Sequence, residues 1–181
     1  MTDMYKLRST KAFCNFITKT LRSITVKRDS AAPNACMILK DNYHLIHRTA
    51  GAVLADLKRS GPIPYSEDGF PRTFAYACDF CRMSRYSLEA DSLERFLDGV
   101  GKNIDLQADE ITLFVDMFRC ALICAVDSLS SDESRKSEVL SAVDSLRFLQ
   151  DYSFDDIYEK ISRSEAVLRE DEYYSLMDKE S

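Results

Sequence analysis

The chain has 181 residues, of which 45% are apolar and 30% charged. It is long enough for one well-filled core and lies within the ordinary globular range, so we expect a single domain over residues 1–181. The formal net charge is −6, yet residues 1–60 hold 11 Lys and Arg against 4 Asp and no Glu. These cations recur at the spacing of a solvated helix face, so we favour a surface stripe over a nucleic-acid-binding segment.

Cysteine content and the absence of an export signal indicate a cellular compartment. Six cysteines occur in a chain whose first ten residues, MTDMYKLRST, have no apolar export region, which favours reduced thiols in a cytoplasmic protein. No stretch approaches the roughly 20 apolar residues of a membrane span. We therefore expect a soluble piece, with any membrane part of a larger protein beyond Ser181.

In the first half of the chain, apolar residues recur at helical spacing in two long segments. Residues 4–25 form the first, so residues 1–30 are expected to be a basic helix and linker preceding a helical core at 34–181. The second runs from Asn34 to Arg59, and Pro33 suits its first turn. The Pro-rich connector from Gly61 to Pro71 is neither helix nor central strand, because its prolines lack the backbone donor.

Shorter helices are predicted next, and the fold class follows from them. We expect helices at 72–83 and 89–99, with Gly99 and Gly101 stopping the latter. Residues 108–129 are apolar nearly all round, which places that helix at the centre of a bundle. The scarcity of Gly and Pro favours long helices. The sequence thus predicts an all-α bundle of about seven helices with one Pro-rich connector.

Two capping patterns predict the last helices. Ser130 with Glu133 forms a capping-box pattern for a helix at 132–149. Ser153 with Asp156 repeats it for the final helix, and Tyr152 is placed to pack on Ile157 across that cap. The final helical pattern continues to the C-terminus without a stop signal, so we expect the chain to continue into a longer parent protein.

No residue set demands a chemistry. His44 and His47 are three apart on one helix, without an H-E-x-x-H pattern. The carboxylates of Asp109 and Glu110 open a helix, where the dipole favours negative charge. A Gly-rich phosphate loop and a D-x-D pattern are both missing. We therefore predict no catalytic residue and no cofactor.

Four cysteines offer a less favoured metal site. Cys78 and Cys81 have C-x-x-C spacing and Cys120 and Cys124 are four apart, so a four-thiolate zinc site is conceivable. The surrounding stretch FAYACDFCRM is apolar and helical, and a buried cysteine ordinarily behaves as a small hydrophobe. We favour core packing over zinc.

Several short motifs follow one another in an order that resembles a known family. They are DNYHLI (Asp41 to Ile46), GFPRTFAYA (Gly69 to Ala77), DEITLF (Asp109 to Phe114), SLRFL (Ser145 to Leu149) and SEAVLREDEYYSLMDKES (Ser164 to Ser181). In this order they resemble the N-terminal helical region of bacterial cyclic β-1,2-glucan synthases. The chain differs from family members in carrying His47, Arg48 and Thr49 where acidic and Gln residues are usual, and Phe114 where Trp is common.

The resemblance implies a context rather than an activity. In these large proteins the region precedes a membrane-embedded glycosyltransferase that uses UDP-glucose, and a phosphorylase-like domain follows. Everything catalytic in the family lies beyond the position of Ser181. The resemblance therefore implies a non-enzymatic scaffold or regulatory module at the cytoplasmic face of the inner membrane, whose partner is the remainder of the larger polypeptide or its membrane domain.

Some motif residues suit structural roles. Asp41 and Asn42 are polar positions on an otherwise buried helix, able to bind the backbone of the Pro-rich connector. Arg72 follows Pro71 at a helix start and is expected to pair with a carboxylate, either Asp41 or Glu110. Such a pair would fix how the connector crosses the bundle.

Two functional classes remain open. The favoured one is a scaffold that docks through an exposed apolar patch on the last helix, which would also permit self-association. That patch comprises Tyr173, Tyr174, Leu176 and Met177. The alternative is a stand-alone binding module for a carbohydrate or protein partner, with a pocket lined by aromatic and polar-tipped side chains. The expected pocket residues are Tyr43, His44, His47 and Tyr76.

Overall fold

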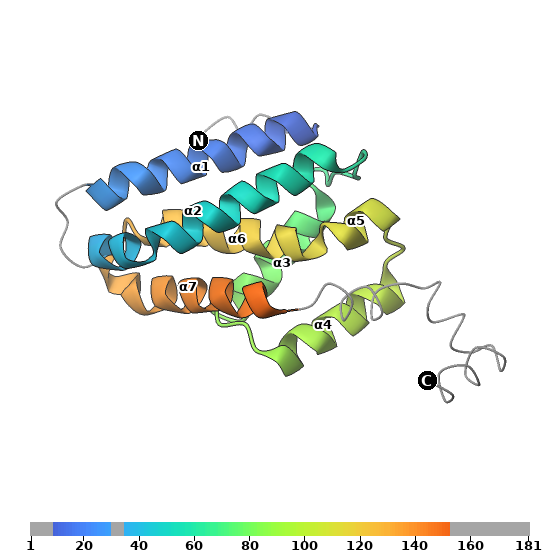
Figure 1. Ribbon diagram of the computed structural model, residues 1–181. Helices are drawn as coiled ribbons and strands as arrows, with labels where there is room; N and C mark the ends of the chain where they lie inside the picture. The colour runs from blue at the N-terminus through green and yellow to red at the C-terminus, as the bar shows by residue number, and fades with distance from the viewer. Residues whose placement is uncertain (1–8, 30–34, 153–181) are drawn as a thin grey trace, which may run out of the picture.

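The computed structural model describes residues 9–29 and 35–152, and these ranges form an all-α bundle (Figure 1). They contain seven α-helices, one 3-10 turn and no strand. The helices are α1 (Thr10–Asp29), α2 (Ala35–Arg59), α3 (Arg72–Met83), α4 (Ala90–Asn103), α5 (Ala108–Thr112), α6 (Phe114–Leu129) and α7 (Lys136–Asp151). The predicted fold class is confirmed.

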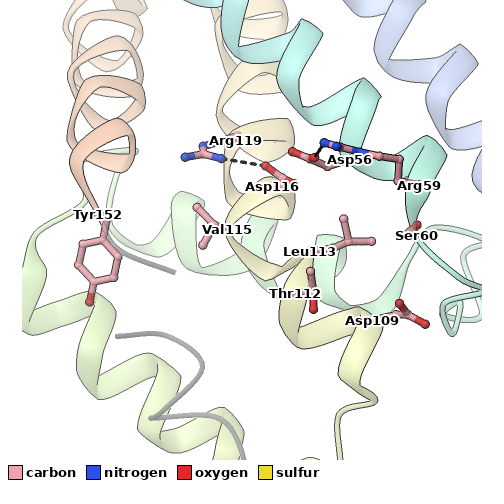
Figure 2. A pocket seen from close by; sticks show the side chains of 10 residues that line it. All are labelled: Asp56, Arg59, Ser60, Asp109, Thr112, Leu113, Val115, Asp116, Arg119 and Tyr152. Atoms are coloured by element: carbon pink, nitrogen blue, oxygen red, sulfur yellow. Dashed lines mark hydrogen bonds and ion pairs between the residues drawn. The ribbon is translucent and has the colours of Figure 1, made fainter. Parts of the chain in front are cut away.

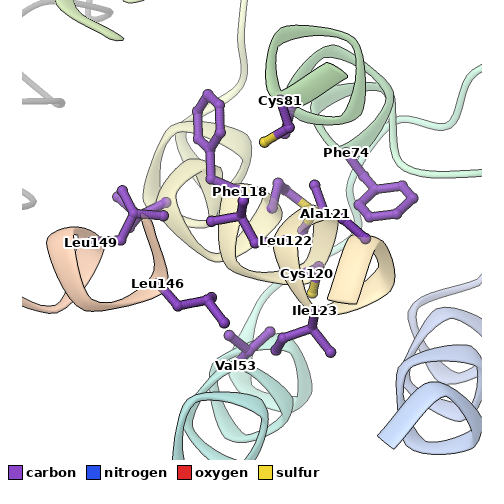
Figure 3. Packing of buried hydrophobic residues seen from close by; sticks show 14 of the residues in the cluster. Val53, Phe74, Cys81, Phe118, Cys120, Ala121, Leu122, Ile123, Leu146 and Leu149 are labelled. Atoms are coloured by element: carbon purple, nitrogen blue, oxygen red, sulfur yellow. The ribbon is translucent and has the colours of Figure 1, made fainter. Parts of the chain in front are cut away.

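Helix α6 is the centre of the bundle. Of its 16 residues 12 are buried, which fits the prediction of a central helix that is apolar nearly all round. Helices α1, α2, α3 and α7 all pack against it. Figure 3 shows Phe118 and Leu122 of α6 among side chains from three other helices. These neighbours are Val53 of α2, Phe74 and Cys81 of α3, and Leu146 and Leu149 of α7.

Helices α1 and α2 form a long antiparallel pair along one side of the bundle (Figure 1). Phe13, Ile17 and Ile24 of α1 are fully buried, at the helical spacing that the sequence shows. The backbone N–H of Ala12 donates to Ser9 Oγ at 3.2 Å, so a side chain outside the helix satisfies one of its free donors. Burial of the apolar face of α1 therefore holds this helix beside α2.

The Pro-rich connector turns sharply before α3. Gly69 has φ 83°, a left-handed conformation that favours glycine, and the N–H of Ser66 donates to Phe70 O at 2.8 Å. The N–H of Arg72 then donates to Pro64 O at 3.1 Å, which closes the connector onto the first residue of α3. Helix α3 has the predicted bounds of 72–83.

Helix α4 corrects the prediction that Gly99 and Gly101 end it. The helix runs through both glycines to Asn103, and the N–H of Ile104 still donates to Val100 O at 2.9 Å. Leu97 and Val100 are buried on its inner face. Burial of these side chains outweighs the cost of about 1 kcal/mol for each glycine in a helix.

The predicted continuous helix over 108–129 is divided at Leu113. This residue has φ −90° and ψ 0°, outside the α-helical region, which ends α5 and begins α6. Leu113 is itself buried. The break therefore occurs inside the core, where no Gly or Pro marks it in the sequence.

The predicted capping box of Ser130 and Glu133 is wrong. Ser130 Oγ donates to Asp127 O at 3.0 Å and so belongs to the end of α6. Asp132 is the cap instead: its Oδ1 accepts the N–H of Ser134 at 2.9 Å, opening the 3-10 turn η1 (Glu133–Arg135) before α7. The predicted last helix and the packing of Tyr152 on Ile157 lie outside the described residues.

Candidate functional site

Arg72 and Glu110 form a two-pronged ion pair between α3 and α5. Arg72 Nε and Nη2 donate to the two carboxylate oxygens of Glu110, both at 2.6 Å. Glu110 is fully buried and also accepts the N–H of Gln107 at 3.0 Å, while Arg72 Nη2 donates to Asp105 O at 2.7 Å. The hydrogen bond to Glu110 raises the pKa of Arg72 above its ordinary value. Of the two carboxylates expected to pair with Arg72, the fold places Glu110 beside it.

Asn42 holds α2 to α7, which corrects its expected contact with the connector. Its Nδ2 donates to Ile38 O at 2.9 Å, and its Oδ1 accepts from Arg147 Nη2. Residue 42 lies about 25 Å along the helix axis from the end of α2, where the connector begins. Asp41, the other residue expected at the connector, is exposed. The expected contact was therefore out of reach.

Of the four residues expected to form a ligand pocket, Tyr43 and His47 contact each other on α2, with ring centroids 5.6 Å apart. Tyr43 is held against α1: its hydroxyl lies 3.0 Å from Thr25 Oγ1 and its ring centroid 3.9 Å from the Arg28 guanidinium carbon. His44 and His47 are exposed on α2. Tyr76 lies half-buried on α3. None of the four lines the cavities described below, so the expected pocket stays a prediction.

Three of the four candidate zinc ligands line one cavity. Cys78, Cys81 and Cys124 border a space of about 340 Å³ between α1, α3 and α6, and Cys120 is buried. Burial raises the pKa of Cys78 to about 11 and of Cys81 to about 12, and it raises the pKa values of Cys120 and Cys124 as well. In the part of the chain that the structure describes, no three His, Cys, Asp or Glu side chains are grouped to hold a metal. The zinc alternative gains no support there.

A second cavity carries charged side chains that the sequence reasoning missed (Figure 2). It measures about 470 Å³ and lies between the end of α2, the α5–α6 junction and Tyr152, just beyond α7. Its charged residues are Asp56, Arg59, Asp109, Asp116 and Arg119.

Two D-x-x-R pairs contribute to this cavity, Asp56 with Arg59 and Asp116 with Arg119. The same spacing occurs in two surface pairs, Asp79 with Arg82 and Asp144 with Arg147. The spacing was therefore visible in the sequence, but it did not distinguish the cavity pairs from the surface pairs.

Asp116 is the most buried charged group of this cavity. It is 5% exposed, and its Oδ1 accepts from Arg119 Nη1 at 2.9 Å. Arg119 Nη2 also donates to Leu149 O at 2.8 Å, which fixes the guanidinium between α6 and α7. Burial raises the pKa of Asp116, Arg119 opposes that rise and the charge of Asp56 adds to it. The site thus combines a buried carboxylate with a guanidinium held in place.

No family model matches this chain, and the comparisons with curated proteins and with solved structures give no match either. Across the helices of the described residues, none combines the length and the apolar character needed to cross a bilayer.

Proposed function

We propose that this chain is a non-catalytic helical scaffold of the kind that precedes the membrane-embedded transferase in cyclic β-1,2-glucan synthases. It acts by docking on the remainder of a glucan-synthase-like polypeptide or its membrane domain, at the cytoplasmic face of the membrane. The parent protein would transfer glucose from UDP-glucose.

The observation that supports this proposal is that polar motif residues bind one another. Asn42 of DNYHLI accepts from Arg147 of SLRFL, and Arg72 of GFPRTFAYA pairs with Glu110 of DEITLF. Ser145 of SLRFL adds a third tie to the α3–α4 loop, since its Oγ donates to Tyr86 O at 2.7 Å and accepts the N–H of Leu88 at 2.8 Å. Motifs far apart in the chain thus share one task, which is to hold the helices in a fixed arrangement.

These contacts favour architecture over chemistry for the motif residues. A buried carboxylate that is paired on both oxygens has little freedom to move a proton or bind a substrate, and Glu110 is in that state. A rigid bundle with polar ties between its helices is suited to presenting a constant surface to a neighbouring domain.

The test uses the transferase part of a cyclic glucan synthase from which the corresponding N-terminal region has been removed. Membranes containing that protein are mixed with this chain, and both co-sedimentation and glucose incorporation from UDP-glucose are measured. We expect the chain to sediment with these membranes and to raise incorporation. With membranes that lack the transferase, the chain should stay in the supernatant. The absence of transferase-dependent sedimentation, or release of UDP by the purified chain alone, would contradict the proposal.

A pair of matched variants tests the expected docking patch. Tyr173, Tyr174, Leu176 and Met177 lie outside the described residues, so their role in docking or self-association stays a prediction. Leu176→Asp should weaken co-sedimentation, because a carboxylate opposes burial in an apolar interface. Leu140→Asp is the control, since Leu140 is an exposed leucine on α7. Equal loss from both substitutions would argue against the patch.

A further inference from the structure

The cavity bordered by α2, α5 and α6 is lined by a carboxylate that uses one of its oxygens for an ion pair and keeps the other open to the cavity. Asp116 is 5% exposed, yet only its Oδ1 is bonded, to Arg119. No hydrogen bond from the described residues reaches its Oδ2, and the residue lines the cavity (Figure 2). Among the described residues the buried side-chain atoms that lack a hydrogen bond do not include this oxygen, so Oδ2 is open to the cavity. This oxygen is therefore available to a ligand.

The other polar groups of the cavity also offer mainly acceptors. Ser60 Oγ donates to Leu57 O and Thr112 Oγ1 donates to Ala108 O, so both hydroxyls keep lone pairs for a ligand. Asp56 binds Arg59 through Oδ1. Asp109 receives the backbone N–H of Gly61 at a long 3.4 Å. A fitting ligand must therefore donate several hydrogen bonds.

The charges narrow the class of ligand further. A phosphate group would meet three carboxylates, and an organic cation would meet the guanidinium groups of Arg59 and Arg119. A neutral ligand with many hydroxyls meets neither repulsion, because each hydroxyl can donate to a carboxylate and accept from a guanidinium. Leu113, Val115 and the ring of Tyr152 supply an apolar wall for the C–H face of a ring.

We propose that this cavity binds a neutral saccharide. The Asp116 and Asp56 carboxylates accept sugar hydroxyl protons, and the Arg119 guanidinium donates from its fixed position between α6 and α7. The volume of about 470 Å³ lies within the range of roughly 300–1,000 Å³ found for ligand pockets. The inference depends on the cavity alone and does not rest on the scaffold role.

The test is a titration of the full-length, ¹⁵N-labelled chain followed by NMR. The probes are glucose, its β-1,2-linked disaccharide sophorose and its β-1,4-linked disaccharide cellobiose, with inorganic phosphate and putrescine as charged competitors. We expect at least one saccharide to shift the backbone amide signals of Ser60, Thr112 and Arg119 in a saturable way. No saturable shift by any saccharide would overturn the proposal, as would tighter binding of phosphate or putrescine at these amides.

Matched variants identify the carboxylate responsible. Asp116→Asn should weaken saccharide binding about tenfold or more, as expected for loss of a charge-assisted hydrogen bond. Asp79→Asn removes the same i,i+3 pairing from an exposed site on α3 and should leave the affinity unchanged. If Asp116→Asn does not fold, Asp56→Asn on the half-buried side of the cavity serves in its place. Unchanged affinity in the folded variant overturns the assignment.

Discussion

The central α5–α6 segment buries two kinds of ionisable group, carboxylates near its start and a thiol near its middle. At one end Glu110 and Asp116 are carboxylates held by Arg72 and Arg119. Further along, Cys120 is a fully buried free thiol. Burial raises the pKa of Asp116 and of Cys120 for the same reason, since it disfavours the charged form. The difference is that a thiol can stay neutral at pH 7, whereas a charged carboxylate depends on its guanidinium.

The largest effect is expected when a carboxylate loses its partner. Arg72→Met should lower the free energy of unfolding by about 3–5 kcal/mol, because Glu110 is left buried and unpaired. Urea denaturation measures this, and the double variant with Glu110→Gln should recover most of the loss. Arg82→Met is the control: its pair with Asp79 is exposed and worth at most about 1 kcal/mol. Equal losses from Arg72→Met and Arg82→Met would contradict the distinction between buried and exposed pairs.

A smaller effect is expected when a buried thiol is removed. Cys120→Ala should cost about 0.5–1.5 kcal/mol, comparable to the deletion of one buried methylene, because only packing is lost. The same urea experiment gives this value. A loss as large as that of Arg72→Met would mean that the thiol has a role beyond packing.

At alkaline pH the buried thiols should affect the stability of the fold. Folded Cys78 and Cys81 have pKa values of about 11 and about 12, above the ordinary 9.0, so the unfolded chain releases these protons first. Their contribution to stability is therefore complete below pH 9 and is lost as the pH rises through 11 and 12. We also expect slow labelling of both thiols by a disulfide reagent at pH 8 and rapid labelling in urea. Equally fast labelling in both states would show that these thiols are accessible.

The smallest effect is expected from the pH dependence at Asp116. Its folded pKa is raised above 3.8, so stability falls as the pH rises through the window between 3.8 and the folded pKa. Asp116→Asn removes this fall. The free energy of unfolding of the variant minus that of the native chain should therefore increase from pH 4 to pH 6. A decrease over this range would mean that Arg119 lowers the pKa of Asp116 more than burial raises it.

Periodicity in the sequence determined the fold class and the long helices. The apolar stripe of residues 34–59 and the helix start at Pro71 correspond to α2 and α3 within one residue, because local spacing and missing donors act within a few residues. The nearly all-round apolar character of residues 108–129 likewise predicted a central position.

Only the tertiary structure decided the helix ends and the sites. Helix α4 continues through two glycines because Val100 packs in the core, and the break at Leu113 has no local signal. Arg72 pairs with Glu110 and not with Asp41 because α3 and α5 lie side by side. The packing of the helices also decides which two of the four D-x-x-R pairs line a cavity. Such contacts join residues 33 to 105 positions apart, so spacing along the chain carries no information about them.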